Sequence, residues 1–298
     1  MNSRERGFLL LSSYLGDPLR HPLTAPQLRE LERCVLRSEK PDNDRDLLPE
    51  DLVALGCSEV IAEKVVSLLS DEWVLDEYIQ KGSAVGCVPL TRASEQYPLR
   101  LRKSLKMDAP GCIWMKGNRK LLNKPAVALV GSRNLSVPNE AFARQVGLLA
   151  AQYGLVLISG NARGADTAAQ ESCLRAGGNV ISVVADSLCN KEPTEHMLFI
   201  SEDGFDLPFS NQRALSRNRL IHAMASNVFV AQCSNGTGGT WDGTCRNLRG
   251  GWSKVYCITD GSAASVKLYK MGAGLIGVGK MNEKFIEICD EIDQNDNQ

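Results

Sequence analysis

The sequence lacks a long apolar run and an excess of either charge. Its first apolar stretch, residues 8–11, is far shorter than a signal-peptide core or the roughly 20 apolar residues of a membrane-spanning helix. Lysine and arginine number 34 against 35 aspartate and glutamate, for a net charge of −1. We therefore expect a cytoplasmic globular protein, in which any contact with nucleic acid depends on a local basic surface.

The sequence also lacks the spacings of a metal site. It holds only three histidines, and its ten cysteines are scattered without a Cys-x-x-Cys pair. In a reducing compartment such cysteines are small core residues. The sequence therefore predicts no metal ion and no other cofactor.

The length of 298 residues suits one large domain and one small one. Residues 1–80 are expected to be helical, with a loop at residues 38–46 and a helix-turn-helix around Gly56 that resembles a SAM or degenerate helix-hairpin-helix module. Two interpretations are open, a clamp on a DNA duplex or a packing module. Packing is favoured, because the turn has one glycine and no basic neighbour. Residues 81–280 are expected to form an α/β domain, and residues 281–298 a polar C-terminal tail.

The centre of the chain alternates buried strands with helices. Residues 126–130 are all small or apolar, as in a parallel strand buried on both faces. A helix capped by Ser136, with Pro138 in its first turn, leads to a second strand at residues 155–159. Right-handed crossovers then place the first two helices on one face of the sheet. Further strands are predicted at residues 86–90, within 109–118, and at 179–184, 227–232 and 254–259, whereas residues 185–208 are expected to be irregular.

The turn after the first central strand differs from a dinucleotide-binding fingerprint. In G-x-G-x-x-G a second glycine allows close approach of the pyrophosphate, and here Arg133 stands in its place after Gly131 and Ser132. A guanidinium fork and a hydroxyl can hold a phosphate at a helix start. The alternative is a tight turn at Gly131 with a surface salt bridge at Arg133. Spacing alone does not decide between them.

The turn after the second central strand carries a similar pattern. Gly160, Arg163 and Gly164 precede a helix, whose free N–H groups and dipole favour an anion. Asp166 lies in the first helical turn and is interpreted as a structural cap. A catalytic acid would need a partner base, and none is near in sequence. We therefore predict no catalytic residue.

Short motifs in a characteristic order run from about residue 80 to 275: Tyr97-Pro98 with Leu101, Pro110, Met115-Lys116-Gly117-Asn118, Val130-Gly131-Ser132-Arg133, Ser159-Gly160, Ala162-Arg163-Gly164 with Asp166, Ala168-Ala169, Ile200-Ser201-Glu202, and Arg217-Asn218-Arg219 with Ile221. In this order and spacing the chain resembles the DprA/Smf family, DNA-processing proteins that bind single-stranded DNA and load the RecA recombinase. The two glycine-arginine turns are specific in combination.

The resemblance implies an extended Rossmann-like domain, a mostly parallel sheet with helices on both faces, whose turn edge forms a positive pocket for single-stranded DNA. It also implies a homodimer that loads or assists a RecA-type recombinase in DNA uptake, transformation or recombination. Bases would stack on aromatic side chains, for which Phe199, Phe205 and Phe209 are candidates. By position, the phosphate-binding residues would be Gly131, Ser132, Arg133, Gly160, Arg163, Gly164, Lys191, Arg217, Asn218 and Arg219.

Three departures from the family pattern indicate a divergent member. Residues 191–193 replace a Tyr-Pro-x-x-Asn segment, with Lys191 as the remaining basic residue. Residues 237–244 replace a Ser-Gly-Ser turn, and no winged helix follows. These changes bear more on RecA loading than on DNA binding.

The altered third turn supports an alternative function. Gly238, Gly239 and Thr240 resemble the Gly-Gly-x-Gly-Thr motif of LOG-type nucleotide hydrolases, in which a glutamate shortly after the motif performs acid–base chemistry. Here no glutamate follows, and Asp242 could replace it only if the loop curls back. This argues against hydrolysis and leaves a nucleotide sensor, for example in phage defence, as the alternative. A third interpretation is a scaffold with a vestigial pocket.

Overall fold

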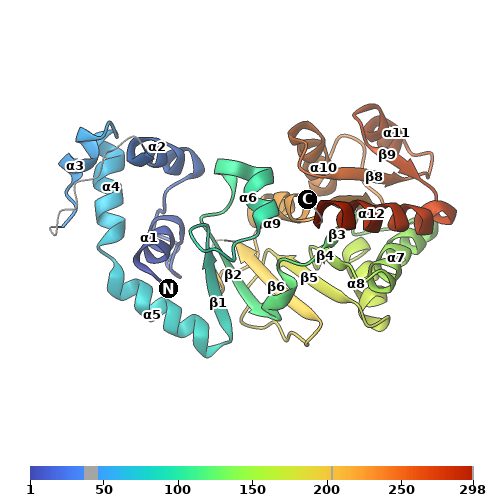
Figure 1. Ribbon diagram of the computed structural model, residues 1–298, viewed down its shortest axis with the longest axis horizontal. Coiled ribbons are helices and arrows are strands. Elements are labelled where there is room, and N and C mark those ends of the chain that lie inside the picture. Colours follow the sequence, from blue (N-terminus) through green and yellow to red (C-terminus); the bar gives the residue numbers. More distant parts are fainter. Residues whose placement is uncertain (37–45, 203, 297–298) are drawn as a thin grey trace.

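The computed structural model describes residues 1–36, 46–202 and 204–296 (Figure 1). The described residues form a nine-stranded sheet in the order β1-β2-β6-β5-β4-β3-β7-β8-β9. Its strands are β1 (Cys87–Thr91), β2 (Cys112–Gly117), β3 (Ala126–Val130), β4 (Val156–Ser159), β5 (Asn179–Val184), β6 (Met197–Glu202), β7 (Asn227–Val230), β8 (Lys254–Ile258) and β9 (Gly274–Ile276). Strands β3 to β9 are parallel, and β2 pairs antiparallel with both β1 and β6. The predicted Rossmann-like α/β fold is confirmed.

Helices cover both faces of the sheet because successive residues of the central strands point to opposite sides. Val127 and Leu129 join one core with α7 (Val137–Gln152), α8 (Ala165–Arg175) and α12 (Met281–Asp296). Ala128 and Val130 join the opposite core with α6 (Leu99–Leu105), α9 (Asn211–Met224), α10 (Gly239–Gly250) and α11 (Ala263–Lys270). The helices that follow β3 and β4 therefore share one face, as predicted from crossover handedness.

The strand order reverses at β3. From β3 the chain adds β4, β5 and β6 on one side, whereas β7, β8 and β9 extend the sheet on the other side. The turns that leave β3 and β7 therefore diverge to opposite faces, toward α7 and α10, and open a crevice at the carboxyl ends of these strands. Open α/β sheets bind ligands at such a switch point.

The amino-terminal helices are α1 (Ser3–Ser12), α2 (Ala25–Leu36), α3 (Pro49–Ala54), α4 (Glu59–Leu69) and α5 (Glu72–Ala84). They form two packing groups. Helices α2, α3 and α4 share a small apolar core of their own. Helices α1 and α5 instead pack on the sheet, where Tyr78 of α5 meets Trp114 of β2 with ring centroids 5.1 Å apart. The expected boundary at residue 80 falls inside α5. Of the loop expected at residues 38–46, all but residue 46 lies outside the described residues.

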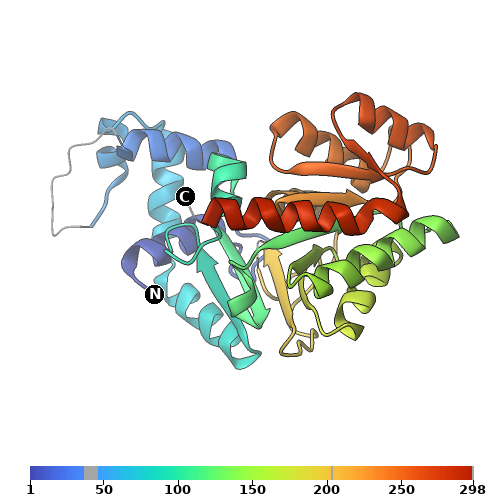
Figure 2. The ribbon, with the colours of Figure 1, turned by 45° about the vertical axis from the view of Figure 1, so that its right-hand side comes forward.

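Two expectations need correction. Residues 185–208, expected to be irregular, contain β6, which lies between β5 and β2. Residues 281–298, expected to be a polar tail, contain α12, which lies across the sheet beside α7 (Figure 2). Buried Met281, Phe285 and Ile288 are spaced along one helical face of α12. The surrounding acidic residues obscured this stripe in the sequence.

This placement of α12 predicts unequal effects of two neighbouring substitutions. Phe285 is fully buried and stacks on Phe229 with ring centroids 5.2 Å apart, whereas Ile286 is 44% exposed. We expect Phe285→Ala to lower the free energy of unfolding by about 3–5 kcal/mol, because it removes a buried ring and leaves a cavity. Ile286→Ala should change it by less than about 0.5 kcal/mol. Urea unfolding measures both, and similar small effects would contradict the docking of α12.

Candidate functional site

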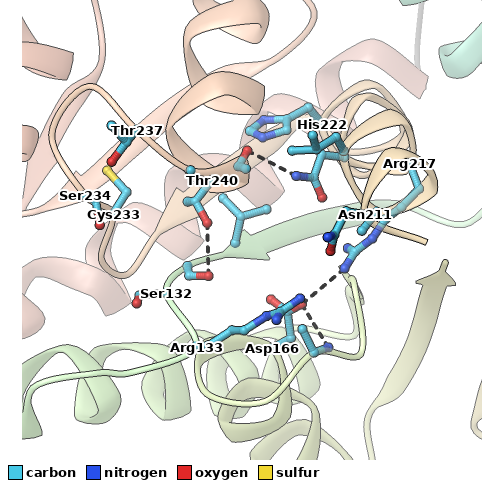
Figure 3. A pocket seen from close by; sticks show the side chains of 18 residues that line it. Ser132, Arg133, Asp166, Asn211, Arg217, His222, Cys233, Ser234, Thr237 and Thr240 are labelled. Atoms are coloured by element: carbon cyan, nitrogen blue, oxygen red, sulfur yellow. Dashed lines mark hydrogen bonds and ion pairs between the residues drawn. The ribbon is translucent and has the colours of Figure 1, made fainter. Parts of the chain in front are cut away.

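A pocket of about 440 Å³ lies at the carboxyl ends of β3, β4 and β7 (Figure 3). Three turns and one helix build its wall. The turn after β3 supplies Ser132 and Arg133, the turn after β4 leads to Asp166, and α9 contributes Arg217 and His222. The turn after β7, residues 233–240, closes the remaining side and leads into α10. The turns that were singled out in the sequence therefore converge on one pocket.

Backbone contacts fix the three turns to one another. The Ser132 N–H donates to the Gln232 carbonyl over 2.8 Å, and the Ala165 N–H donates to the Ser132 carbonyl over 3.1 Å. The Thr240 hydroxyl donates to the Gly131 carbonyl over 3.0 Å. Gly164 has a φ of +89°, and a Cβ there would lie 2.5 Å from the Ser132 carbonyl oxygen. Only glycine therefore allows the first two turns to approach so closely.

Arg217 is the buried cation of the pocket, with 9% of its surface exposed. Its guanidinium lies directly over Gly160, where a Cβ would be 1.4 Å from Nη1. Nη2 lies 4.0 Å from Asp166 Oδ2, and among the described residues Nε has no hydrogen-bond partner. Burial lowers the pKa of Arg217, and the nearby Asp166 carboxylate opposes this shift. A buried guanidinium whose donors are not satisfied by the protein favours an anionic ligand.

Asp166 holds the second turn and faces Arg217. Its carboxylate accepts hydrogen bonds from the Gly160 N–H over 3.1 Å and from the Ala162 N–H over 3.2 Å. Burial raises the pKa of Asp166, whereas the charge of Arg217 and these two N–H groups lower it. The carboxylate thus both shapes the turn and balances the buried guanidinium, as expected of a structural residue.

The two turn arginines take different positions. Arg133 lines the pocket and reaches toward Asp166 and Arg217 (Figure 3), and its charge acts on the pKa of both. Arg163 is exposed beside the pocket, and its guanidinium donates to Asn134 Oδ1 over 3.1 Å. Gly160 leaves space for the Arg217 guanidinium, and Gly164 leaves space for the turn after β3.

Like Gly160, Arg163 and Gly164, two further proposed phosphate ligands do not line this pocket. Arg219 forms an ion pair with Glu202 and donates to the Asp108 carbonyl over 2.9 Å. Residues two apart on a helix point in directions about 200° apart, so Arg219 faces away from the pocket that Arg217 enters. Lys191 instead pairs with Asp186 over 2.6 Å. Asn218, between the two arginines, does line the pocket, and its Nδ2 donates to the Gly239 carbonyl over 3.1 Å.

Of the remaining residues predicted from the sequence to contact a ligand, some line the pocket and others do not. Gly238, Gly239 and Thr240 line the pocket at the start of α10. Phe199 and Phe205 are buried in the core that α1 and α5 share with the sheet, whereas Phe209 is 53% exposed two residues before α9 begins. Of the aromatic candidates, only Phe209 can therefore present a ring to a ligand.

Sequence reasoning missed several wall residues, among them Asn211, Leu215, His222, Cys233 and Thr237. His222 is fully buried, and this burial lowers its pKa to about 3. A single histidine on a helix has no spacing pattern that could reveal it. The described residues contain no group of three or more potential metal ligands, and none of their helices is long and apolar enough to span a membrane.

The pairing of Asp166 with Arg217 predicts a large effect on stability. Asp166→Asn removes the charge that balances the buried guanidinium, so the free energy of unfolding should fall by about 3–5 kcal/mol. Glu171→Gln on the same helix removes only exposed pairs with Arg175 and Arg144 and should cost less than about 1 kcal/mol. Urea unfolding of both variants measures the difference. Equal costs would show that the Asp166–Arg217 pair is not a structural constraint.

Comparison with known proteins shows which family the chain resembles. The model of the family described as DNA recombination-mediator protein A matches residues 89–246. DNA processing protein DprA of Streptococcus pneumoniae is 33% identical over 141 residues, 44% of this chain and 50% of that protein. Protein Smf of Escherichia coli is 28% identical over 199 residues, 61% of this chain and 52% of that protein. The chain thus spans about half the length of these curated relatives.

Solved structures agree with this assignment. The X-ray structure of DprA from Streptococcus pneumoniae matches with a TM-score of 0.66 and 26% identity, over 85% of this chain and 95% of that one. DNA processing protein A from Helicobacter pylori, whose structure was studied for its mode of single-stranded DNA binding, matches with a TM-score of 0.56 and 22% identity, over 67% of this chain and 96% of that one. The second match supports the fold alone. Because the family model covers more than half of its residues, the chain belongs to the DNA recombination-mediator protein A family, the DprA/Smf proteins.

Proposed function

We propose that this chain is a DNA-processing protein that binds single-stranded DNA through its phosphate backbone at the switch-point pocket. The observation that carries the proposal is Arg217, a buried guanidinium in the pocket wall whose Nη2 lies 4.0 Å from Asp166 Oδ2, beyond hydrogen-bond distance. Arg133 adds a second guanidinium and Ser132 a hydroxyl at the same turn edge. Family membership supports the same conclusion, and the Helicobacter pylori relative binds single-stranded DNA.

The chemistry of the pocket suits a polyanion. Guanidinium groups bind phosphate with paired hydrogen bonds, and the first N–H groups of α10 have no partner within the helix. Such contacts recognise the backbone and not the sequence, and they release counterions. Since the net charge of the chain is only −1, this local pair of arginines would dominate the electrostatic attraction.

The wider role follows from family membership. We propose that the chain assists a RecA-type recombinase in DNA uptake, transformation or recombination, and that it acts as a cytoplasmic homodimer. Direct participation of Arg163 in phosphate binding, from its exposed position beside the pocket, belongs to the same proposal. We assign Lys191 and Arg219 a bracing role, because each is already engaged with a carboxylate.

Binding without catalysis fits this site better than hydrolysis does. Asp242, the one acid that could replace the missing glutamate of a LOG-type hydrolase, pairs with Arg246 over 3.0 Å on α10 and does not line the pocket. A nucleotide sensor stays the alternative, because the Gly238–Thr240 turn and the pocket volume are compatible with a nucleotide. Mass spectrometry of the denatured protein tests it, since a stoichiometric released nucleotide would favour the sensor.

Removal of a pocket arginine should weaken binding at every sequence. We expect Arg133→Ala to reduce affinity for single-stranded oligonucleotides about tenfold at low salt, and to reduce the slope of log K against log salt by about 0.7. Arg175→Ala, an exposed arginine on α8 outside the pocket, should leave both unchanged. Gel-shift titrations at several salt concentrations measure these values. Equal affinity for duplex and single strands, or no binding at low salt, would refute the proposed function.

Phe209 should stack on a base of the bound strand. Arg213 donates to the Leu207 and Pro208 carbonyls over 2.9 and 2.8 Å, which holds the segment that carries the exposed ring. We expect Phe209→Ala to weaken strand binding roughly tenfold, because stacking on an aromatic ring contributes about 1–3 kcal/mol per base. Trp73→Ala is the matched control, since Trp73 is 70% exposed on α5, whereas Phe209 lies two residues before Asn211, which lines the pocket. Fluorescence anisotropy of labelled oligonucleotides measures both, and an unchanged affinity for Phe209→Ala would remove Phe209 from the binding surface.

A further inference from the structure

A second hollow lies where α1 and α6 meet the end of β1. Its volume is about 530 Å³, and its walls hold the basic residues Arg4, Arg92, Arg102 and Lys106 together with Phe8 and Met107. None of the described residues that line it is acidic, although acidic residues slightly outnumber basic ones in the whole chain. The four basic side chains come from α1, the turn after β1, α6 and η1 (Lys106–Asp108). Separate elements therefore bring these cations together in what we call the basic hollow.

Three of these cations have no carboxylate partner among the described residues. The side chains of Arg4 and Lys106 are exposed and make no hydrogen bond or ion pair with any of them. Arg102 is also exposed, and its guanidinium donates only to the carbonyls of Arg92 and Ser94. The hollow therefore offers three positive charges that the surrounding protein does not balance.

Two carboxylates close to the hollow are already engaged. Glu32 of α2 forms an ion pair with Arg92, and Asp108 forms one with Arg29. The Arg92 guanidinium also lies over the Phe8 ring, 5.4 Å from its centroid. Arg92 is thus a fixed and balanced part of the wall, and neither carboxylate is left to neutralise the remaining cations. An anion that enters the hollow would do so.

The backbone of Lys106 is of a kind that favours glycine. Its φ is +51° and its ψ −121°, and its N–H donates to the Arg102 carbonyl where α6 ends. A residue with a side chain is strained in this conformation, and such strain is concentrated at functional sites. Since the Lys106 side chain makes no contact that would offset the strain, the position is consistent with a cation that is used outside the protein.

The basic hollow is built at the same sheet edge as the switch-point pocket. Strand β1 is antiparallel to β2, and β2 is antiparallel to β6, so β1 runs in the same direction as β6 and β3. Arg92 directly follows β1 and therefore stands at the edge from which the turns after β3, β4 and β7 emerge. Strand β1 lies five strands from β3 in the sheet order, roughly 24 Å at about 4.8 Å per strand.

The surface between the two sites is hollowed as well. A depression of about 590 Å³ shares Met107 with the basic hollow. It extends to Ser210 and Gln212, the neighbours of Asn211, which lines the switch-point pocket. A chain of phosphates can therefore pass from one site to the other around the start of α9.

We propose that the basic hollow is a second phosphate-binding site, which holds the backbone of the same single strand beyond the switch-point pocket. This inference rests on the proposed function, because Arg133 and Arg217 would hold the first segment of that strand. Guanidinium and ammonium groups bind phosphates without regard to sequence. At the B-form rise of about 3.4 Å per nucleotide, a strand needs about seven nucleotides to span roughly 24 Å. Helix α1 of the amino-terminal region thus takes part in binding, through Arg4.

Two exposed cations allow a direct test. Arg4→Ala combined with Lys106→Gly removes two charges without removing a side-chain contact within the described residues, and glycine suits the backbone of residue 106. Arg119→Ala combined with Lys120→Ala is the matched control. These two residues are also exposed, but they belong to η2 (Arg119–Leu121), which follows β2 and so lies at the opposite sheet edge. Urea unfolding checks that both double variants remain folded.

The test measures fluorescence anisotropy of labelled oligothymidylates of about 4 and about 30 nucleotides, which are shorter and longer than the span of about seven. For the long oligomer, we expect the Arg4→Ala, Lys106→Gly variant to lose affinity about tenfold at low salt. The slope of log K against log salt should fall by about 1.4, since each lost phosphate contact reduces it by about 0.7. The affinity for the short oligomer should stay unchanged, whereas Arg133→Ala should weaken the binding of both.

The outcomes distinguish this inference from the proposed function. An unchanged affinity of the Arg4→Ala, Lys106→Gly variant for the long oligomer, or a loss no larger than that of the control variant, would overturn the inference and leave the proposed function intact. An equal loss for both lengths would also overturn it, since the hollow would then not act as a second site on a longer strand. If this variant loses the long oligomer while Arg133→Ala binds normally, strand binding at the basic hollow is supported and the proposed function is refuted.

Discussion

The close approach of Arg217, Asp166 and Gly160 is the constraint on which the site depends. The guanidinium comes from α9 on one face of the sheet and the carboxylate from α8 on the other. They meet only because Gly160 has no side chain between them. Asp166 in turn holds the Gly160–Ala162 turn through two backbone N–H groups. The contact therefore joins both helical layers at the point where the strand order reverses.

The central fold could be predicted because its signals are local. Strand β3 coincides with the predicted residues 126–130, and Gly154 ends α7 with a φ of +67° as its position in the sequence indicates. The sequence failed where local signals were weak or masked. Strand β6 begins with four apolar residues, but the polar segment at residues 190–195 before it made the whole region resemble a loop. The acidic residues of α12 obscure its apolar stripe.

The candidate site was predictable in its backbone and less so in its side chains. Glycines and helix starts place all three turns at one sheet edge, and a resemblance to a family can assign the basic residues to it. The resemblance does not reveal in which direction each basic side chain points. Arg217 and Arg219 belong to the same motif, yet helical geometry sends one into the pocket and the other to Glu202. His222 emerges only when α9 and α10 are brought together, since its neighbour Asn247 is 25 residues away in sequence.

The regular spacing of the α9 residues that line the pocket affects how its ligand specificity could evolve. Asn211, Leu215, Asn218 and His222 recur at intervals of three or four residues along the helix and all line the cavity. The opposite wall is built from the turns after β3, β4 and β7, whose main chains are held to one another by hydrogen bonds. Selection for a new ligand would therefore act on one helical stripe, and substitutions one turn apart could alter what is bound while the sheet and its turns stay the same. Homologues with divergent ligands should then differ in a periodic pattern along this single helix.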